Sequence, residues 1–177
     1  MIYLNNIGFF FFLVFMFFGC KDSTTTSDCN SDCDIIGACY CVQFTKVDGA
    51  DQTLTENQDC ITDEICLTRG NNKGLYNSAL YSSDNEMIEA YQNGEEVLIK
   101  WGDGTIEDAI NGEVTLYNGL TNEAGNIGSL TSLPDRQIIA YLVNYDVYLN
   151  FKFVSWSSGN SGGGGGFSYI RDIPVLN

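Results

Sequence analysis

Cysteines are the residues of this chain whose spacing most clearly indicates chemistry. The 177-residue sequence contains seven of them and no His. The lack of His excludes Ser-His-Asp and Cys-His catalysis, and every metal site that depends on imidazole. Six of the cysteines lie in one stretch, at Cys29, Cys33, Cys39, Cys41, Cys60 and Cys66. Because their spacing lacks the paired C-x2-C motifs of a Cys₄ zinc site, it favours disulfides in an oxidising compartment.

The positions of the six cysteines restrict how they can pair. Cys39 and Cys41 would point to the same face of one strand, where a bond between them would be strained. We therefore expect both to bond back to the two cysteines that precede them. Cys60 and Cys66 flank a short segment and could close a small loop between them.

Acidic side chains are the second source of candidate chemistry. Asp28, Asp32 and Asp34 lie among the cysteines, and Asp103 and Asp108 lie further along the chain. Either set could bind calcium through hard oxygen ligands. The first set does not fit the EF-hand spacing, and a solvated loop or turn is the stronger interpretation of both. Calcium is the one cofactor that the sequence leaves open.

Carboxylates could also serve a glycan-active enzyme, which needs two opposed ones. Asp and Glu total 23 in this chain, so finding candidate pairs among them means little. We therefore do not expect an enzyme.

Aromatic residues and glycines form a third pattern near the C-terminus. Trp156, Phe167 and Tyr169 flank the glycine run 162–166, which is either a mobile lip or a tight bend. The run lacks the Lys-Ser/Thr of a phosphate-binding loop and joins two strands. Aromatic faces beside flexible backbone can stack on sugar rings, so carbohydrate binding is the sharpest functional hypothesis. The alternative, which we favour from sequence alone, places Trp156 and Phe167 in the core.

The elements that must position these side chains are short strands. Runs of β-branched and aromatic residues alternate with Gly, Asn and Asp, as in antiparallel sheets. We predict strands over residues 40–47, 65–68, 74–77, 96–101, 113–117, 137–143, 147–156 and 167–171, a helix over 84–91, and tight turns at 102–104 and 111–112. The alternation along 147–156 indicates one buried and one solvated face. This pattern predicts an all-β fold, an antiparallel β-sandwich or jelly-roll-like domain with a disulfide-rich N-terminal segment.

The first 19 residues carry no charge, and most of them form an apolar run. Residues 7–19 have the length of a signal-peptide core, whereas a spanning helix needs about 20 apolar residues. The run ends at Phe17-Phe18-Gly19-Cys20, and a polar Ser/Thr-rich stretch follows. This arrangement resembles a bacterial lipoprotein signal, in which a small residue precedes the Cys that is lipidated and becomes the mature N-terminus. The resemblance implies a lipid on Cys20, export, and anchorage to the outer membrane on its periplasmic or cell-surface face.

These boundaries divide the chain into a signal peptide (1–19), a lipidated Cys20 with a flexible tether (20–28), and one β-rich domain (29–177) whose Cys-rich part spans 29–66.

The segment 151–171 resembles the end of an uncharacterised domain found in exported bacterial proteins. It has the pattern F-x-F-x-x-W-S-S-G…G-G-G-F-S-Y-x-R. Residues 61–72 and 74–77 resemble the start of that domain. The resemblance covers about residues 59–171 and implies the fold and export, but no chemistry.

Charge narrows the class of partner. The chain has 23 Asp and Glu residues and 8 Lys and Arg residues, which gives a net charge of −15. This charge repels nucleic acid phosphates and anionic lipid headgroups. We therefore expect a membrane-anchored, non-catalytic binding or display module. Its expected partners are the membrane, through the lipid on Cys20, and a polysaccharide or another envelope protein. The alternatives are a purely structural or adhesion protein of the envelope, or a small glycan-active enzyme.

Overall fold

The computed structural model of the chain describes residue 33 and residues 40–120, 127–134, 136–158 and 164–176. The strands are β1 (Cys41–Lys46), β2 (Asp59–Thr62), β3 (Ile65–Arg69), β4 (Leu75–Asn77), β5 (Ile99–Asp103), β6 (Gln137–Leu142), β7 (Val147–Trp156) and β8 (Phe167–Asp172). The helices are α1 (Asp84–Gln92) and α2 (Ile106–Ile110), with short 3₁₀ turns at Thr55–Asn57, Leu130–Ser132 and Val143–Tyr145.

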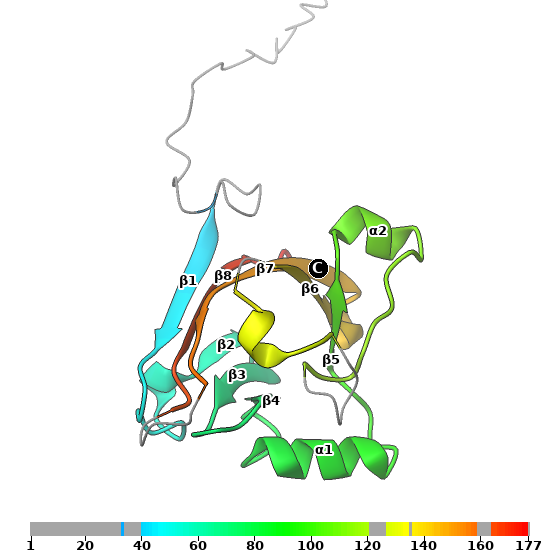
Figure 1. Cartoon of the computed structure of the whole chain (residues 1–177). Coiled ribbons are helices and arrows are strands. Elements are labelled where there is room, and N and C mark those ends of the chain that lie inside the picture. The colour runs from blue at the N-terminus through cyan, green and yellow to red at the C-terminus, as the bar shows by residue number, and fades with distance from the viewer. Residues whose placement is uncertain (1–32, 34–39, 121–126, 135, 159–163, 177) are drawn as a thin grey trace, which may run out of the picture.

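The strands form two antiparallel sheets. The larger sheet has the order β1-β8-β7-β6-β5, and the smaller has the order β2-β3-β4. Figure 1 shows the larger sheet as an arch, with the smaller sheet beneath it and α1 below that sheet. The predicted all-β fold is confirmed, and so is the predicted helix, which lies at 84–92.

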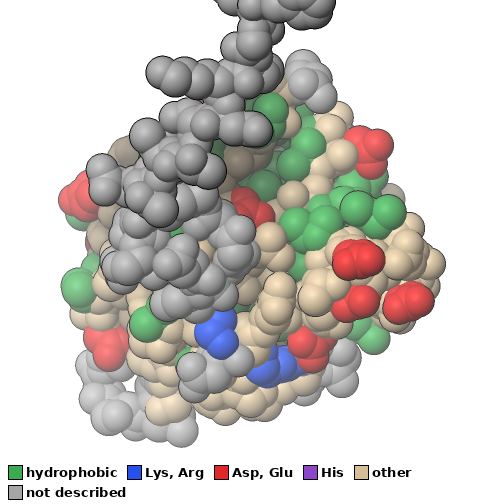
Figure 2. Space-filling model, turned by 90° about the horizontal axis from the view of Figure 1, so that it is seen from above, with side chains coloured by type: hydrophobic (Ala, Val, Ile, Leu, Met, Phe, Trp, Pro, Cys, Tyr) green, Lys and Arg blue, Asp and Glu red, His purple; other side chains and the backbone are tan. Residues whose placement is uncertain are grey.

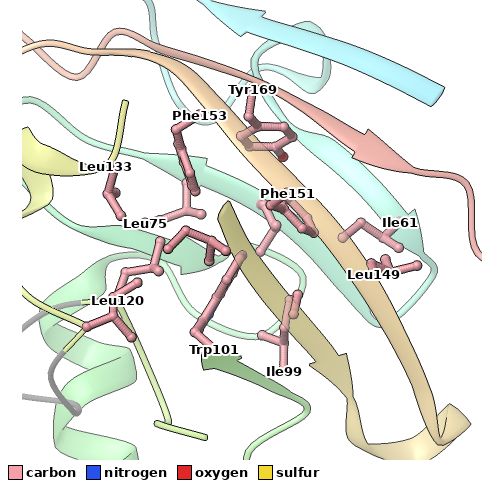
Figure 3. Close-up of a cluster of buried hydrophobic side chains, with 14 of the residues drawn as sticks. Ile61, Leu75, Ile99, Trp101, Leu120, Leu133, Leu149, Phe151, Phe153 and Tyr169 are labelled. Carbon is pink, nitrogen blue, oxygen red and sulfur yellow. The ribbon is translucent and has the colours of Figure 1, made fainter. Parts of the chain in front are cut away.

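The hydrophobic core fills the space between the two sheets. Along β7, Leu149, Phe151 and Phe153 are buried, as the sequence alternation predicted. The Phe151 ring contacts Trp101 of β5 edge-on at 5.1 Å between centroids and Tyr169 of β8 at 4.9 Å. Figure 3 shows these aromatic rings together with side chains of the smaller sheet in one cluster. The smaller sheet is therefore held against the arch by apolar contacts from β5, β7 and β8.

A buried ion pair also joins the two sheets. Asp59 of β2 accepts hydrogen bonds from Arg171 of β8, Nε to Oδ2 at 2.6 Å and Nη2 to Oδ1 at 2.7 Å. The Tyr169 hydroxyl donates to the same Oδ2 at 2.7 Å. All three residues are at most 6 % exposed. Burial, followed by the neighbouring Asp59 charge, raises the pKa of Tyr169 well above its usual value, so the hydroxyl stays protonated and keeps donating.

Two of the predicted disulfides are present in the part of the chain that is described. Cys33 bonds to Cys41, at the start of β1, and Cys60 bonds to Cys66 across the β2–β3 pair. The first confirms that Cys41 pairs with an earlier cysteine, and the second confirms the small loop. Cys29 and Cys39 lie outside the described residues, as do the predicted signal peptide, Cys20 and the tether.

One sequence prediction about the middle of the chain is wrong. Residues 113–117 do not form a strand, because only Tyr117 pairs, in an isolated bridge with Trp101. The predicted turn at Asn111-Gly112 is present, but it follows α2 and does not join two strands. Thr105 starts that helix: its side chain accepts from the Asp108 backbone N–H, and the Asp108 side chain accepts from the Thr105 N–H.

Strand β2 and helix α2 were missed. In β2 only Cys60 and Ile61 are apolar, too few to stand out as a strand, and α2 has only five residues, too few for a helical period. None of the helices described is both long and apolar enough to cross a membrane.

We predict that Asp59→Asn lowers the free energy of unfolding by about 3–5 kcal/mol, because it leaves the Arg171 charge buried without a partner. Denaturant unfolding followed by tryptophan fluorescence measures this change. The triple variant Asp59→Leu/Tyr169→Phe/Arg171→Met removes all three polar partners together, and we expect it to recover most of the loss. A nearly unchanged unfolding midpoint for Asp59→Asn would contradict the role given to the pair.

Candidate functional site

A pocket of about 700 Å³ lies where β7 ends, beside the start of α1. Its wall comes from separate parts of the chain: Arg69 with residues 72–74 after β3, residues 84–85 at the start of α1, residues 128–131, and residues 156–158 at the end of β7. The β3–β4 pair and α1 therefore form one side of the pocket, and the larger sheet forms another.

The pocket wall is rich in groups that form hydrogen bonds. Amide and hydroxyl side chains that are exposed there are Asn72, Asn85, Ser129, Thr131 and Ser158. Asparagine offers both a donor and an acceptor, and each hydroxyl can do either. Such a wall suits a ligand that itself carries several hydroxyl groups.

Arg69 fixes the side of the pocket that β7 and β8 form. It is 2 % exposed, and its Nη1 donates to the carbonyl oxygens of Ser157 at 3.2 Å and Gly166 at 3.1 Å. Nη2 donates to Ser157 O at 3.1 Å, and Nε donates to Lys73 O at 2.9 Å. Burial lowers the pKa of the guanidinium to about 10, which leaves it charged at neutral pH.

The Arg69 guanidinium also lies over the ring of Trp156, 3.9 Å from the ring centroid. A cation in that position is attracted by the electron-rich face of the indole. The ring meets Phe153 edge-on at 5.8 Å and lies 6.1 Å from Phe167, so it is held between the core and Arg69. Trp156 is half-buried and lines the pocket, with one face of its ring taken by Arg69.

The start of α1 is attached to the same loop. Asp84 is buried, and its carboxylate accepts from the Gly74 N–H at 2.8 Å and from the Asn85 N–H at 3.0 Å. Lys73, which is exposed, donates from Nζ to Asn85 Oδ1 at 3.1 Å. The Asp84 carboxylate therefore binds the backbone of the loop, and the polar ends of Lys73 and Asn85 lie together at the pocket.

The described end of the glycine run, residues 164–166, is a tight bend. The Gly49 N–H donates to Gly164 O at 3.0 Å, Lys46 Nζ donates to Gly165 O at 3.2 Å, and the Gly166 N–H donates to Asp48 Oδ1 at 2.9 Å. Lys46 is buried, and burial, followed by the nearby Arg69 charge, lowers its pKa.

Only glycine fits this bend. Gly165 has φ of +80°, and a Cβ there would lie 2.7 Å from Gly70 O; a Cβ on Gly166 would lie 2.5 Å from Asp48 Oδ1. The sequence left a mobile lip or a tight bend as interpretations of the glycine run, and residues 164–166 form the bend. Residues 159–163 lie outside the described residues.

The structure corrects part of the predicted sugar-binding surface. Trp156 lines the pocket, but Phe167 and Tyr169 are only 1 % and 0 % exposed and cannot stack on a ligand. The reason is the strand period: residues 167, 169 and 171 of β8 point between the two sheets, where Tyr169 meets Phe151 (Figure 3). Their side chains belong to the core.

The predicted calcium ligands that are described have other partners. Asp103 forms an ion pair with Arg136, and Asp108 closes the N-terminus of α2 with Thr105. No group of three or more acidic or Cys side chains able to hold a metal occurs within the described ranges. Asp28, Asp32 and Asp34 lie outside them.

Sequence reasoning missed Arg69, Lys73 and Asp84 as pocket residues. In the sequence, Arg69 follows a strand and precedes Gly-Asn-Asn, so it looks like an ordinary exposed strand end. The one sequence feature that could have marked Arg69 as a pocket residue is that few other basic residues lie near it in the chain. Its contacts with Ser157 and Gly166 join positions about ninety residues apart, which no local pattern reveals.

No family model, curated protein or solved structure matches this chain.

We predict that Gly165→Ala lowers the free energy of unfolding by about 2 kcal/mol or more, because alanine at positive φ is strained and its methyl group would clash with the Gly70 backbone. Gly70→Ala is the matched control, since its Cβ would meet nothing closer than 3.6 Å and should change stability little. Thermal unfolding by circular dichroism compares the two. Equal melting temperatures would show that the bend tolerates a side chain.

Proposed function

We propose that this protein is an exported lipoprotein, anchored through a lipid on Cys20, whose β-domain binds a saccharide in the pocket beside Trp156. The observation that carries the binding part is the pocket itself, in which exposed amide and hydroxyl groups surround an indole ring. The anchor part is supported by the uncharged apolar run that ends at Gly19-Cys20.

A saccharide suits this wall for two physical reasons. Its hydroxyl groups can exchange hydrogen bonds with Asn72, Asn85 and Ser158 in place of water. Its apolar C–H faces pack well on aromatic surface, and Trp156 contributes such surface on the part of its ring that Arg69 leaves uncovered. Since the Arg69 contact already occupies one face, the ring acts as a wall of the pocket and not as a free platform.

The position of the pocket in the larger sheet supports an anchored binding module. Strand β1 starts at Cys41, opposite Asp172, and ends at Lys46, opposite Phe167. Phe167 in turn pairs with Trp156. The chain from Cys20 therefore enters at one end of β1 and the pocket lies at the other, some 20 Å away for a strand of this length. This arrangement suits an anchored domain that holds its pocket away from the membrane.

We predict that Cys20→Ser abolishes labelling by radioactive palmitate and moves the protein from the membrane fraction to the soluble fraction of a bacterial host that processes lipoproteins. The reason is that each buried CH₂ of the lipid contributes about 0.8 kcal/mol to membrane binding. Cys60→Ser is the matched control and should keep its label. Persistent labelling of Cys20→Ser would show that the anchor is not at this residue.

We predict that the full-length protein in detergent binds saccharides on a glycan array, and that Asn85→Ala weakens this binding about ten-fold through loss of one hydrogen bond. Asn144→Ala is the control, because Asn144 is also exposed and, among the residues described, its side chain bonds to exposed Glu64 alone. Trp156→Ala should also abolish binding, with stability checked by thermal unfolding. If no saccharide is retained by the wild-type protein, the binding proposal fails.

A further inference from the structure

We infer that the saccharide bound in this pocket is anionic, and that its acidic group binds between Arg69 and Lys73. This inference rests on the proposed function and specifies its ligand. It follows from how the charged groups of the pocket are paired.

Among the residues that the structure describes, Arg69 is a buried cation without an ion-pair partner. The two ion pairs of the described residues are Arg136 with Asp103 and Arg171 with Asp59, and Arg69 takes part in neither. Its hydrogen bonds all go to backbone carbonyl oxygens, which satisfy donors but do not neutralise the charge. A buried charge that is left unpaired costs free energy, and an anion that reaches it recovers part of that cost.

One N–H of the Arg69 guanidinium remains for a ligand. Nη1 uses both of its hydrogens, on Ser157 and Gly166, whereas Nη2 has a single acceptor, Ser157 O, among the residues described. In the planar guanidinium the remaining Nη2–H points to the same side as Nε–H, which donates to Lys73 O. Both Arg69 and Lys73 line the pocket, so this N–H lies on the side of the guanidinium next to the Lys73 segment of the pocket wall.

Lys73 supplies a second positive charge at the same place. Its side chain is exposed, and its ammonium donates to Asn85 Oδ1, with further N–H groups left for a ligand. A pair of cations of this kind, one rigid and one flexible, binds a carboxylate or sulfate by charge-assisted hydrogen bonds.

Two carboxylates, Asp84 and Asp48, lie near Arg69, and both raise the pKa of its guanidinium, against the larger lowering by burial. Asp84 lines the pocket, but its oxygens accept from the Gly74 and Asn85 backbone. Asp48 accepts from the Gly166 N–H, and its bonds to Ser157 and Gly166 lower its pKa, so this carboxylate is also held by the bend. The lining residues carry two positive charges, on Arg69 and Lys73, and one negative charge, on Asp84, which leaves one positive charge in excess for an anionic ligand.

The placement of these cations is unusual for this chain. It has only 8 basic residues against 23 acidic ones. Acidic side chains are spread over the face shown in Figure 2. Long-range electrostatics would repel an anionic chain, so short-range contacts at Arg69 and Lys73 must provide the selectivity.

The test compares saccharides that differ in charge but share a backbone. Full-length protein in a non-ionic detergent is titrated by calorimetry with polygalacturonate and its methyl ester, with dextran sulfate and dextran, and with inorganic sulfate. These probes separate a carboxylate ligand from a sulfate ligand, and both from a free anion. We expect one charged saccharide to bind at least ten-fold more tightly than its neutral partner, with affinity falling as salt is added.

Two variants locate the binding. Lys73→Gln should weaken binding of the charged saccharide about ten-fold and leave that of the neutral partner unchanged. Lys100→Gln, on β5 and outside the pocket, should change neither. Equal affinity for charged and neutral partners, or charged binding that survives Lys73→Gln, would overturn the inference while saccharide binding itself stands. Binding of sulfate alone would overturn both, as would the absence of any binding.

Discussion

The carboxylate of Asp59 is the interaction on which the packing of the two sheets depends. It comes from the smaller sheet, lies in the interior and is bound by Arg171 and Tyr169 of the larger sheet. Removing these charges from water is costly, and the cost is offset only when the two sheets meet in one register that satisfies all three groups. The apolar core would tolerate some sliding of one sheet over the other, but this triad does not. We infer that the triad favours the one register of the two sheets in which its three groups meet.

Arg69 is a second buried arginine that joins the two sheets, and it also lines the pocket. Arg171 belongs to the larger sheet and binds the smaller, whereas Arg69 belongs to the smaller sheet and binds the backbone where β7 ends and β8 begins. The carbonyls it binds are held in place by the bend at Gly165, which Lys46 also contacts. The pocket wall is thus set by the same contacts that close the end of the arch, so the site and the fold cannot vary independently.

The sequence predicted the fold better than the site. Alternation along 147–156 identified β7 and its buried face, because strand period and burial are both local properties. The same local reasoning misplaced Phe167 and Tyr169, since a run of aromatic residues looks alike whether it faces a core or a ligand. Asn111-Gly112 was ambiguous for a similar reason: a residue pair that closes hairpins also ends helices, and only the capping by Thr105 distinguishes them. Arg69 acts through partners distant in sequence, which one sequence does not disclose.

The pairing of β1 with β8 has a mechanical consequence for an anchored protein. If a ligand held in the pocket is pulled away from the membrane, tension enters at Cys41 and leaves at the opposite end of the sheet. It then runs along the strands, so β1 must slide past β8 and the hydrogen bonds of the whole ladder resist together. Tension across the strands would instead break them one at a time. If the domain is anchored through Cys20 as we propose, this load falls on the β1–β8 ladder in the direction in which the ladder resists best.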